Sequence, residues 1–286
     1  MKDKTKKVIG VDLGGTKVLA GRIHSEVVET SHRELIPKNG NEHDVIHVIL
    51  KSIDTVMDDD VVAIGIGVPS VVDVEKGIVY DVQNIPSWKE VHLKAIIEQH
   101  VGLPTFLNND ANCFALGEKY FGNGKNHESF IGLIVGTGIA AGVVINNRLF
   151  NGHNCGAGEF GVMPYKEHCF EYYACGQFFS NVYGLNGIDV YEKAVQGDPD
   201  SIAKFEEMGK HLGECIKVIL YAVDPPLIIL GGSVSKAYPI YKDALWDSIN
   251  TLVYKNTPGR LRIEVSSNPD LPVLGAGALG YEALGL

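Results

Sequence analysis

Two glycine-rich stretches in this chain place polar and charged side chains where an apolar, strand-like run ends. The first, IGVDLGGTKVLAGRI at residues 9–23, carries Asp12, Gly14, Gly15, Thr16 and Lys17 between two such runs. A tight glycine turn exposes backbone N–H groups, so this turn could bind phosphate, with Asp12 holding Mg²⁺ and Lys17 offsetting phosphate charge. The alternative is an ordinary hairpin turn with a solvated lysine.

The same pattern returns in IGLIVGTGIAAGVVI at residues 131–145, around Gly136, Thr137 and Gly138. The repeat suggests two related halves, each opening with a strand, a turn and a strand. Two glycine turns that face one another could hold a polyphosphate between two domains. The repeat therefore favours phosphate binding over a plain hairpin turn.

A third polar stretch, LNNDANCFALGE at residues 107–118, places Asn109 and Asp110 where a strand gives way to a helix. An aspartate there is commonly a helix N-cap. Alternatively, Asp110 is a general base that takes a proton from a substrate hydroxyl, a role typically worth a factor of about 10² to 10⁴ in rate. The local sequence leaves both interpretations open.

Three further glycine segments need an explanation. GAGEFG at 156–161 and GAGALG at 275–280 both match GxGxxG, but the first follows polar residues and the second lies too near the C-terminus for the acidic ribose ligand expected about 20 residues on. Neither supports a dinucleotide site. Glu159 within the first is unusual for a packing motif, although an exposed loop acid is the alternative. GGS at 231–233 follows an apolar strand, where ligands commonly bind in α/β sheets, and a plain turn is the alternative.

Strands and helices must alternate to position these segments. Apolar and β-branched runs predict an antiparallel meander from residue 7 to 35, and apolar residues spaced by three and four predict a helix over 44–59. The remaining predicted elements are a strand in 61–73, a helix around 93–102, a strand over 104–110, a helix from about 111, helical sequence over 180–223, a strand over 227–234 and a helix over 275–285. This alternation favours an α/β layered fold, with a domain boundary near residues 121–125.

Composition limits the possible partners. The chain has 286 residues, 45% of them hydrophobic, and its 25 basic and 35 acidic residues give a formal charge of -10. That charge would repel nucleic acid or an anionic bilayer at long range. No apolar segment approaches the roughly 20 residues of a membrane span, and the N-terminus has no apolar signal-peptide core. We expect a cytoplasmic protein that binds neither nucleic acid nor membrane.

The five cysteines form no CxxC pair and leave one over in any disulfide scheme, so free thiols in a reducing compartment are the simpler account. Several cysteines and histidines nevertheless lie close in sequence, and a metal site among them is conceivable. They are His153, Cys155, His168, Cys169 and Cys175. Their spacings match no standard zinc pattern.

Taken together, DLGGTK, NNDANCFALGE, GTGIAAG, GAGEFG and LIILGGSV occur in an order and spacing that resembles the ROK family of bacterial sugar kinases and their relatives. The resemblance covers nearly the whole chain. It implies an α/β, actin-like ATPase (ribonuclease H-like) fold of two lobes with a cleft between them. The lobes would be residues 1–122, with a C-terminal helix over about 273–286 packing back on them, and residues 123–272. It also implies phosphorylation of a hexose or N-acetylhexosamine by ATP and Mg²⁺, at O6 as in glucokinases, commonly by a homodimer.

The resemblance also implies roles for individual residues. Asp12 would act in Mg²⁺ and phosphate placement, and Asp110 would be the catalytic base. The remaining nucleotide-binding positions are Gly14, Gly15, Thr16, Lys17, Gly136, Thr137, Gly138, Gly231 and Gly232. The sugar-binding positions are Pro69, Ser70, Asn109, Asp110, Glu159 and Glu171, the last carried by CFEYYACG, which is similar to the family stretch CLExYASG.

The sequence departs from the family pattern at the zinc motif. Val162 stands where the family usually has a histidine that contacts both sugar and zinc, and only Cys169 remains of the CxCGxxGC ligands. We therefore predict that no structural zinc is bound. Ser70 also stands where the family often has glycine. Because this histidine is missing, the sequence does not identify the preferred sugar. Glucose is the first candidate substrate, and N-acetylmannosamine or N-acetylglucosamine is the next.

A second function is open within the same family. Its sugar-responsive regulators carry a helix-turn-helix before the first domain, whereas this sequence has about eight residues there, none apolar in a helical period. Direct DNA binding is therefore not expected. A sugar sensor without catalysis, or one that acts through a partner, is the alternative to the kinase.

Overall fold

The structure, a computed structural model, describes residues 6–38, 40–82 and 85–286 and divides into two compact units. Unit 1 comprises Met1–Asn126, Arg148–Ala157 and Asn268–Leu286, and unit 2 comprises His127–Asn147 and Gly158–Ser267. The sequence-based division assigned residues 148–157 to the second lobe, but they group with unit 1. Two hydrogen bonds explain this grouping: the Asn108 side-chain amide donates to the Asn151 side-chain oxygen, and the Cys155 thiol donates to the Asn108 side-chain oxygen.

Unit 1 is built on a five-stranded sheet in the order β3-β2-β1-β4-β8. Its strands are β3 (Val27–Leu35), β2 (Lys17–His24), β1 (Lys7–Leu13), β4 (Val61–Val68) and β8 (Thr105–Asn109). The first three form the expected antiparallel meander, whereas β4 and β8 continue the sheet in parallel with β1. A small three-stranded sheet contains β5 (Val72–Asp73), β6 (Ile78–Tyr80) and β7 (Glu90–Val91), and β11 (Arg148–Leu149) completes the strands of this unit.

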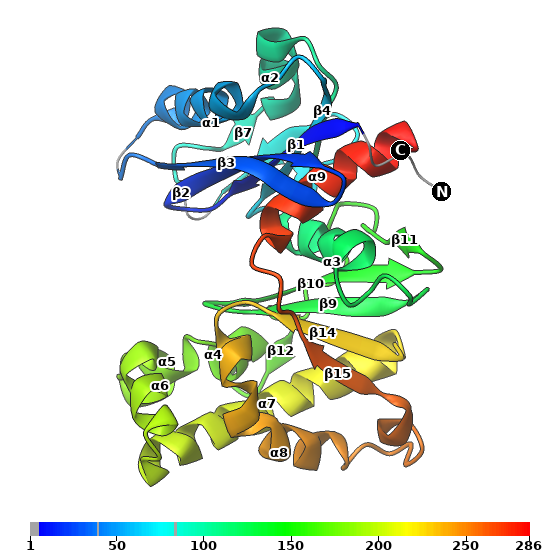
Figure 1. Ribbon diagram of the computed structural model, residues 1–286. Coiled ribbons are helices and arrows are strands. Elements are labelled where there is room, and N and C mark those ends of the chain that lie inside the picture. Colours follow the sequence, from blue (N-terminus) through cyan, green and yellow to red (C-terminus); the bar gives the residue numbers. More distant parts are fainter. Residues whose placement is uncertain (1–5, 39, 83–84) are drawn as a thin grey trace. The chain divides into compact units, whose positions relative to one another are not determined.

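Helices lie on both faces of this sheet, with α1 (Glu42–Val56) and α2 (Leu93–Val101) on one side and α3 (Asp110–Phe121) and α9 (Leu271–Leu284) on the other (Figure 1). Helix α1 begins at a capping box in which Asn41 and Asp44 each bond the other's backbone N–H. Its buried face consists of apolar residues at helical spacing, which confirms the predicted helix near residues 44–59.

The GAGALG segment at 275–280 belongs to α9 and serves close packing of backbone on backbone. A Cβ atom at Gly275 would lie 1.9 Å from the Cys113 carbonyl oxygen, and one at Gly65 in β4 would lie 1.8 Å from the Ala276 oxygen. Side chains at these positions would therefore push α9 away from α3 and from the sheet. This packing role agrees with the sequence argument against a dinucleotide site.

Unit 2 contains a sheet in which β10 (Ile139–Ile145), β9 (Phe130–Val135), β14 (Leu227–Gly231) and β15 (Arg262–Val265) are neighbours in that order. Strands β10 and β9 are antiparallel, and β14 runs parallel to both β9 and β15. A two-stranded hairpin pairs β12 (Pro164–Tyr165) with β13 (His168–Cys169). The repeated strand-turn-strand that opens each half of the sequence is thus β1–β2 in unit 1 and β9–β10 in unit 2.

The helical sequence predicted over 180–223 divides into three helices, because Gly184 and Gly197 adopt positive φ between them. They are α5 (Phe178–Tyr183), α6 (Gly187–Val195) and α7 (Pro199–Ala222). The other helices of unit 2 are α4 (Phe170–Ala174), α8 (Tyr238–Ile249) and the short 3-10 turns η1 (Val234–Ala237) and η2 (Pro258–Arg260). Helices α7 and α8 pack together beside the sheet (Figure 1). Among the described residues, no helix combines the length and hydrophobicity that crossing a bilayer requires.

Candidate active site

The parallel strands of unit 1 bring their predicted site residues to one edge of the sheet. In the strand register, Asp12 of β1 lies opposite Gly67 of β4, which in turn lies opposite Asn108 of β8. The carboxyl ends of these neighbouring strands therefore carry Asp12, the loop after Val68 and the Asn109–Asp110 junction. In α/β sheets this edge is where ligands commonly bind.

Asn109, and not Asp110, is the N-cap of α3. Its side-chain oxygen accepts the Ala111 backbone N–H at 2.8 Å, and its own N–H donates to the Asn108 side chain at 2.8 Å. Asp110 is the first residue of the helix, half-buried, and one of its carboxylate oxygens also accepts the Ala111 N–H at 2.8 Å. The N-cap interpretation of Asp110 is therefore wrong, since the neighbouring asparagine has that role.

The carboxylates of Asp12 and Asp110 both act on one buried thiol in α3. Burial raises the pKa of Cys113 well above its ordinary value, and the charges of Asp110 and Asp12 raise it further. The backbone of β4 also reaches this point, because a Cβ atom at Gly67 would lie 3.2 Å from the Cys113 sulfur and 3.7 Å from the Asp110 Cα atom. The structure thus brings Asp12 and Asp110 into one neighbourhood.

Asp12 has the character of a cation ligand. Burial raises the pKa of its carboxyl group, and the nearby Lys17 ammonium opposes that rise without cancelling it. A carboxylate held in such surroundings gains from a further positive charge. The turn that follows is closed by a hydrogen bond from the Gly14 N–H to the Lys17 oxygen at 2.9 Å, and Thr16 is exposed at its tip. These groups fit Mg²⁺ with phosphate.

The loop after β4 contacts the same junction. The Asn109 side-chain amide donates to the Ser70 carbonyl oxygen at 3.4 Å, and the Ser70 hydroxyl donates to the Tyr80 oxygen at 2.5 Å. Pro69 and Ser70 are both half-buried. Pro69, Ser70, Asn109 and Asp110 therefore form one local group in unit 1.

The glycine turns of unit 2 also lie side by side. The turn between β9 and β10 is closed by a hydrogen bond from the Gly136 N–H to the Gly138 oxygen at 3.0 Å. Gly231 at the end of β14 pairs with Ile134 of β9, and Gly232 has a φ of 84° that lets its backbone approach the Val135 oxygen. The two unit 2 turns that carry predicted phosphate-binding residues thus lie at one sheet edge.

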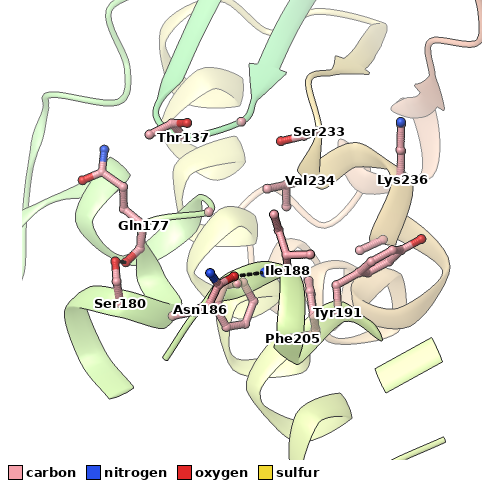
Figure 2. Close-up of a pocket in the computed structure, with 15 residues that line it drawn as sticks. Thr137, Gln177, Ser180, Asn186, Ile188, Tyr191, Phe205, Ser233, Val234 and Lys236 are labelled. Atoms are coloured by element: carbon pink, nitrogen blue, oxygen red, sulfur yellow. Dashed lines mark hydrogen bonds between the residues drawn. The ribbon is translucent and has the colours of Figure 1, made fainter. Parts of the chain in front are cut away.

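A mostly apolar pocket of about 500 Å³ opens beside these turns (Figure 2). Thr137 and Ser233 lie at one end, and Ile188, Tyr191 and Phe205 lie at the other. Gly136 of the β9–β10 turn also lines the pocket. Further lining residues come from the loop after α4, from α5, from α6 and its cap, and from η1; they include Gly176, Gln177, Ser180, Asn186, Gly187, Val234, Lys236 and Ala237. Gly138, Gly231 and Gly232 do not line it.

Sequence reasoning missed most of this pocket, because its residues come from five separate segments. One local signal was available. Asn186 and Gly187 mark a helix start, and the Asn186 side chain does cap α6 by accepting the Ile188 N–H at 2.8 Å. Ile188, the apolar residue that follows, is 68% exposed and lines the pocket.

The two predicted sugar-binding acids lie together in unit 2. Partial burial, and after it the charge of Glu171, raises the pKa of Glu159. One Glu171 carboxylate oxygen accepts the Ile139 N–H at 3.3 Å. The glycines of GAGEFG allow this loop to approach β10, because Cβ atoms at Gly158 and Gly161 would lie 1.9 and 2.3 Å from carbonyl oxygens of that strand. The loop therefore presents Glu159 along the β10 edge.

The region of the expected zinc motif contains a hairpin and an aromatic cluster. Within the described parts of the chain, no three His, Cys, Asp or Glu side chains gather as metal ligands, and the five cysteines are free thiols. Val162, at the usual histidine position, is 58% exposed. The absence of a structural zinc stays a prediction, which metal analysis of the purified protein tests.

Comparison with known proteins identifies the family. The model of the ROK family matches residues 8–283. A glucokinase from Thermotoga maritima is 30% identical over 98% of each chain, and a xylose repressor from Bacillus subtilis is 28% identical over 77% of this chain and 60% of the repressor. A crystal structure of a ROK family glucokinase from Streptomyces griseus, in complex with glucose and AMPPNP, superposes with a TM-score of 0.82 and is 28% identical in sequence. The match covers 96% of this chain and 98% of the glucokinase.

The structural match confirms the predicted α/β, actin-like ATPase fold. The family model spans nearly the entire chain, and the segments DLGGTK, NNDANCFALGE, GTGIAAG, GAGEFG and LIILGGSV all fall within the matched residues. On this evidence, the chain belongs to the ROK family.

Proposed function

We propose that this protein is a sugar kinase that transfers the γ-phosphoryl group of ATP to a hydroxyl group of a hexose or N-acetylhexosamine. The proposed acceptor is the O6 hydroxyl. The observation that carries this proposal is the placement of Asp12 and Asp110 at one edge of the unit 1 sheet, close enough for both charges to act on Cys113. Asp12 could hold the Mg²⁺ that accompanies the phosphate, and Asp110 could accept the proton of a hydroxyl group.

In the proposed reaction, Asp110 accepts the proton of the sugar hydroxyl as its oxygen attacks the γ-phosphate in line. Asn109 holds the start of α3 by capping it, and so fixes the backbone that carries Asp110. Asn109, Glu159 and Glu171 bind sugar hydroxyls through their oxygen atoms, with Pro69 and Ser70 beside the sugar. Burial and the charge of Glu171 raise the pKa of Glu159, and carboxylate oxygens are suitable acceptors for hydroxyl hydrogens.

The nucleotide positions follow from the glycine turns. The backbone N–H groups of Gly14, Gly15, Gly136, Gly138, Gly231 and Gly232 and the hydroxyl groups of Thr16 and Thr137 contact phosphate oxygens. Lys17 adds positive charge, and Asp12 holds Mg²⁺, which when bound supplies charge stabilisation to the transferred phosphoryl group. The apolar pocket beside Thr137 takes the nucleoside, because an aromatic and aliphatic lining suits the faces of a purine base.

The test is a panel of hexoses and N-acetylhexosamines with ATP and Mg²⁺, monitored by coupled ADP release. Turnover of one sugar that falls by a factor of about 10² to 10⁴ in Asp110→Asn, with an unchanged melting temperature, supports the proposal. Asp200→Asn is the matched control, since Asp200 is likewise in the first turn of a helix but pairs with Lys204 on the surface of α7. Equal activity in Asp110→Asn and the wild type would remove the general base from the mechanism.

A sugar sensor without catalysis is the second candidate function, favoured by the similarity to the xylose repressor. In that case no sugar of the panel turns over, yet one of them still raises the melting temperature. Homodimer formation, a cytoplasmic location and the lack of nucleic-acid binding also stay predictions. Light scattering of the purified protein tests the first of them.

A further inference from the structure

The segment from 158 to 171 connects the two proposed sugar-binding acids through the β12–β13 hairpin. Two backbone hydrogen bonds close it: the Glu171 N–H donates to the Gly161 oxygen at 2.9 Å, and the Phe170 N–H donates to the Met163 oxygen at 3.2 Å. The hairpin itself is short, with two residues in each strand. Such a hairpin needs contacts outside itself to keep one conformation.

Those contacts come from α7. The Tyr165 hydroxyl group lies 3.0 Å from the Nδ1 atom of His211, and the Lys166 ammonium lies 3.4 Å from the Nε2 atom of the same ring. His211 is 8% exposed, so the hydrogen bonds it makes are largely protected from water. We call Tyr165, Lys166 and His211 the hairpin clamp.

The Lys166 ammonium determines which ring nitrogen of His211 carries the hydrogen. A lysine ammonium can only donate, so Nε2 of His211 is the acceptor and Nδ1 carries the hydrogen, which it donates to the Tyr165 oxygen. Burial, and after it the charge of Lys166, lowers the pKa of His211, so the ring is neutral. The other charges that act on this ring belong to α7 itself: Glu207, Glu214 and Lys210.

Aromatic packing connects the hairpin clamp to Glu171. The Tyr165 ring stacks on Phe170, the residue before Glu171, with centroids 4.4 Å apart and planes at 15°. Tyr173, on the same short helix α4, meets the Tyr165 ring edge-on at 5.7 Å and the His211 ring at 5.4 Å. Movement of Tyr165 would therefore move the start of α4, which carries the Glu171 backbone.

We propose that Tyr165 and His211 are positioning residues, which hold the β12–β13 hairpin on α7 and thereby fix Glu171 for substrate binding. This inference rests on the proposed sugar-binding role of Glu171. The hairpin would then serve substrate binding by positioning Glu171, without contacting the substrate itself. Loss of the Tyr165–His211 hydrogen bond should weaken sugar binding and leave nucleotide binding unchanged.

The test compares Tyr165→Phe with Tyr238→Phe. Each substitution removes one hydroxyl group from a half-buried tyrosine, and each leaves one ring N–H without its partner, since Trp246 donates to Tyr238 at 3.1 Å. We expect the sugar KM to rise about 10-fold in Tyr165→Phe only, while the ATP KM stays unchanged. His211→Asn, whose amide can still donate to Tyr165, should recover most of the sugar affinity that His211→Leu loses.

A measurement that does not need turnover separates this inference from the proposed function. Hydrogen exchange of the Phe170 and Glu171 amides should accelerate about 10-fold in Tyr165→Phe and remain as in the wild type in Tyr238→Phe. Unchanged exchange at both amides would overturn the positioning role, even if the protein is an active kinase. If these amides exchange faster in Tyr165→Phe but the wild type phosphorylates no sugar, the positioning role stands and only the kinase proposal is overturned.

Discussion

Gly138→Ala should weaken sugar binding by displacing the Glu171 carboxylate. A Cβ atom at Gly138 would lie 2.6 Å from the Glu171 Oε2 atom, whereas ordinary contact begins at 3.4 Å, so that oxygen must move by about 0.8 Å. The same oxygen accepts the Ile139 N–H at 3.3 Å. Gly138 has no positive φ, so alanine adds no backbone strain, and the clash falls on the end of a flexible side chain.

The size of the effect follows from the interaction that is lost. A hydrogen bond from a sugar hydroxyl to the charged Glu171 would contribute about 1.5–3 kcal/mol, and we take the lower end because the carboxylate moves by less than an ångström. At 1.4 kcal/mol per factor of ten, the sugar KM should rise about 10-fold. The melting temperature should fall by less than about 3 °C, because the moved carboxylate can rotate toward water.

The assay is steady-state kinetics with the sugar that the wild type phosphorylates best, together with calorimetric titration of that sugar without nucleotide. Gly136→Ala is the matched control, since the nearest atom to its Cβ would be the Ser233 hydroxyl oxygen at 3.9 Å. If Gly136→Ala has an effect, it should change the ATP KM and not the sugar KM, because Gly136 lines the apolar pocket. Unchanged sugar affinity in Gly138→Ala, or the same loss in both variants, would refute the assignment of Glu171 to the sugar.

Three further outcomes test individual groups. Asp12→Asn should raise the melting temperature of the ligand-free protein by roughly 2–4 °C while abolishing activity, because burial disfavours the charged form of Asp12; a lower melting temperature would contradict this. The pKa of His211 is lowered in the folded state, so the unfolded chain binds its proton first, and stability should fall as pH drops below about 6.5; His211→Asn should lose this dependence in thermal melts at several pH values. Gly275→Ala should lower the free energy of unfolding by about 1–3 kcal/mol, measured by urea titration, without changing the activity of the folded fraction, because its Cβ would lie 1.9 Å from the Cys113 oxygen.

Local patterns predicted the longer strands β1–β4, β8–β10 and β14, but not the short strands β6, β7, β11–β13 and β15. The apolar runs on either side of DLGGTK and GTG predicted β1–β2 and β9–β10, because strand formation and glycine turns depend on neighbouring residues. The sequence also placed Asp110 at a strand-to-helix junction, but it offered Asp110 as the possible cap where the structure has Asn109 in that role. The two residues are adjacent and of similar capping preference, and only the observed geometry of α3 separates them.

Tertiary structure alone decided the apolar pocket, the hairpin clamp and the assignment of residues 148–157 to unit 1. Ile188, Phe205 and Val234 belong to three different elements, and Tyr165 meets His211 across 46 positions of the chain. No periodicity or motif specifies such contacts, because they depend on how helices pack on a sheet and not on the residues next to each other. The sequence determined which groups could do chemistry, and packing determined which of them share a site.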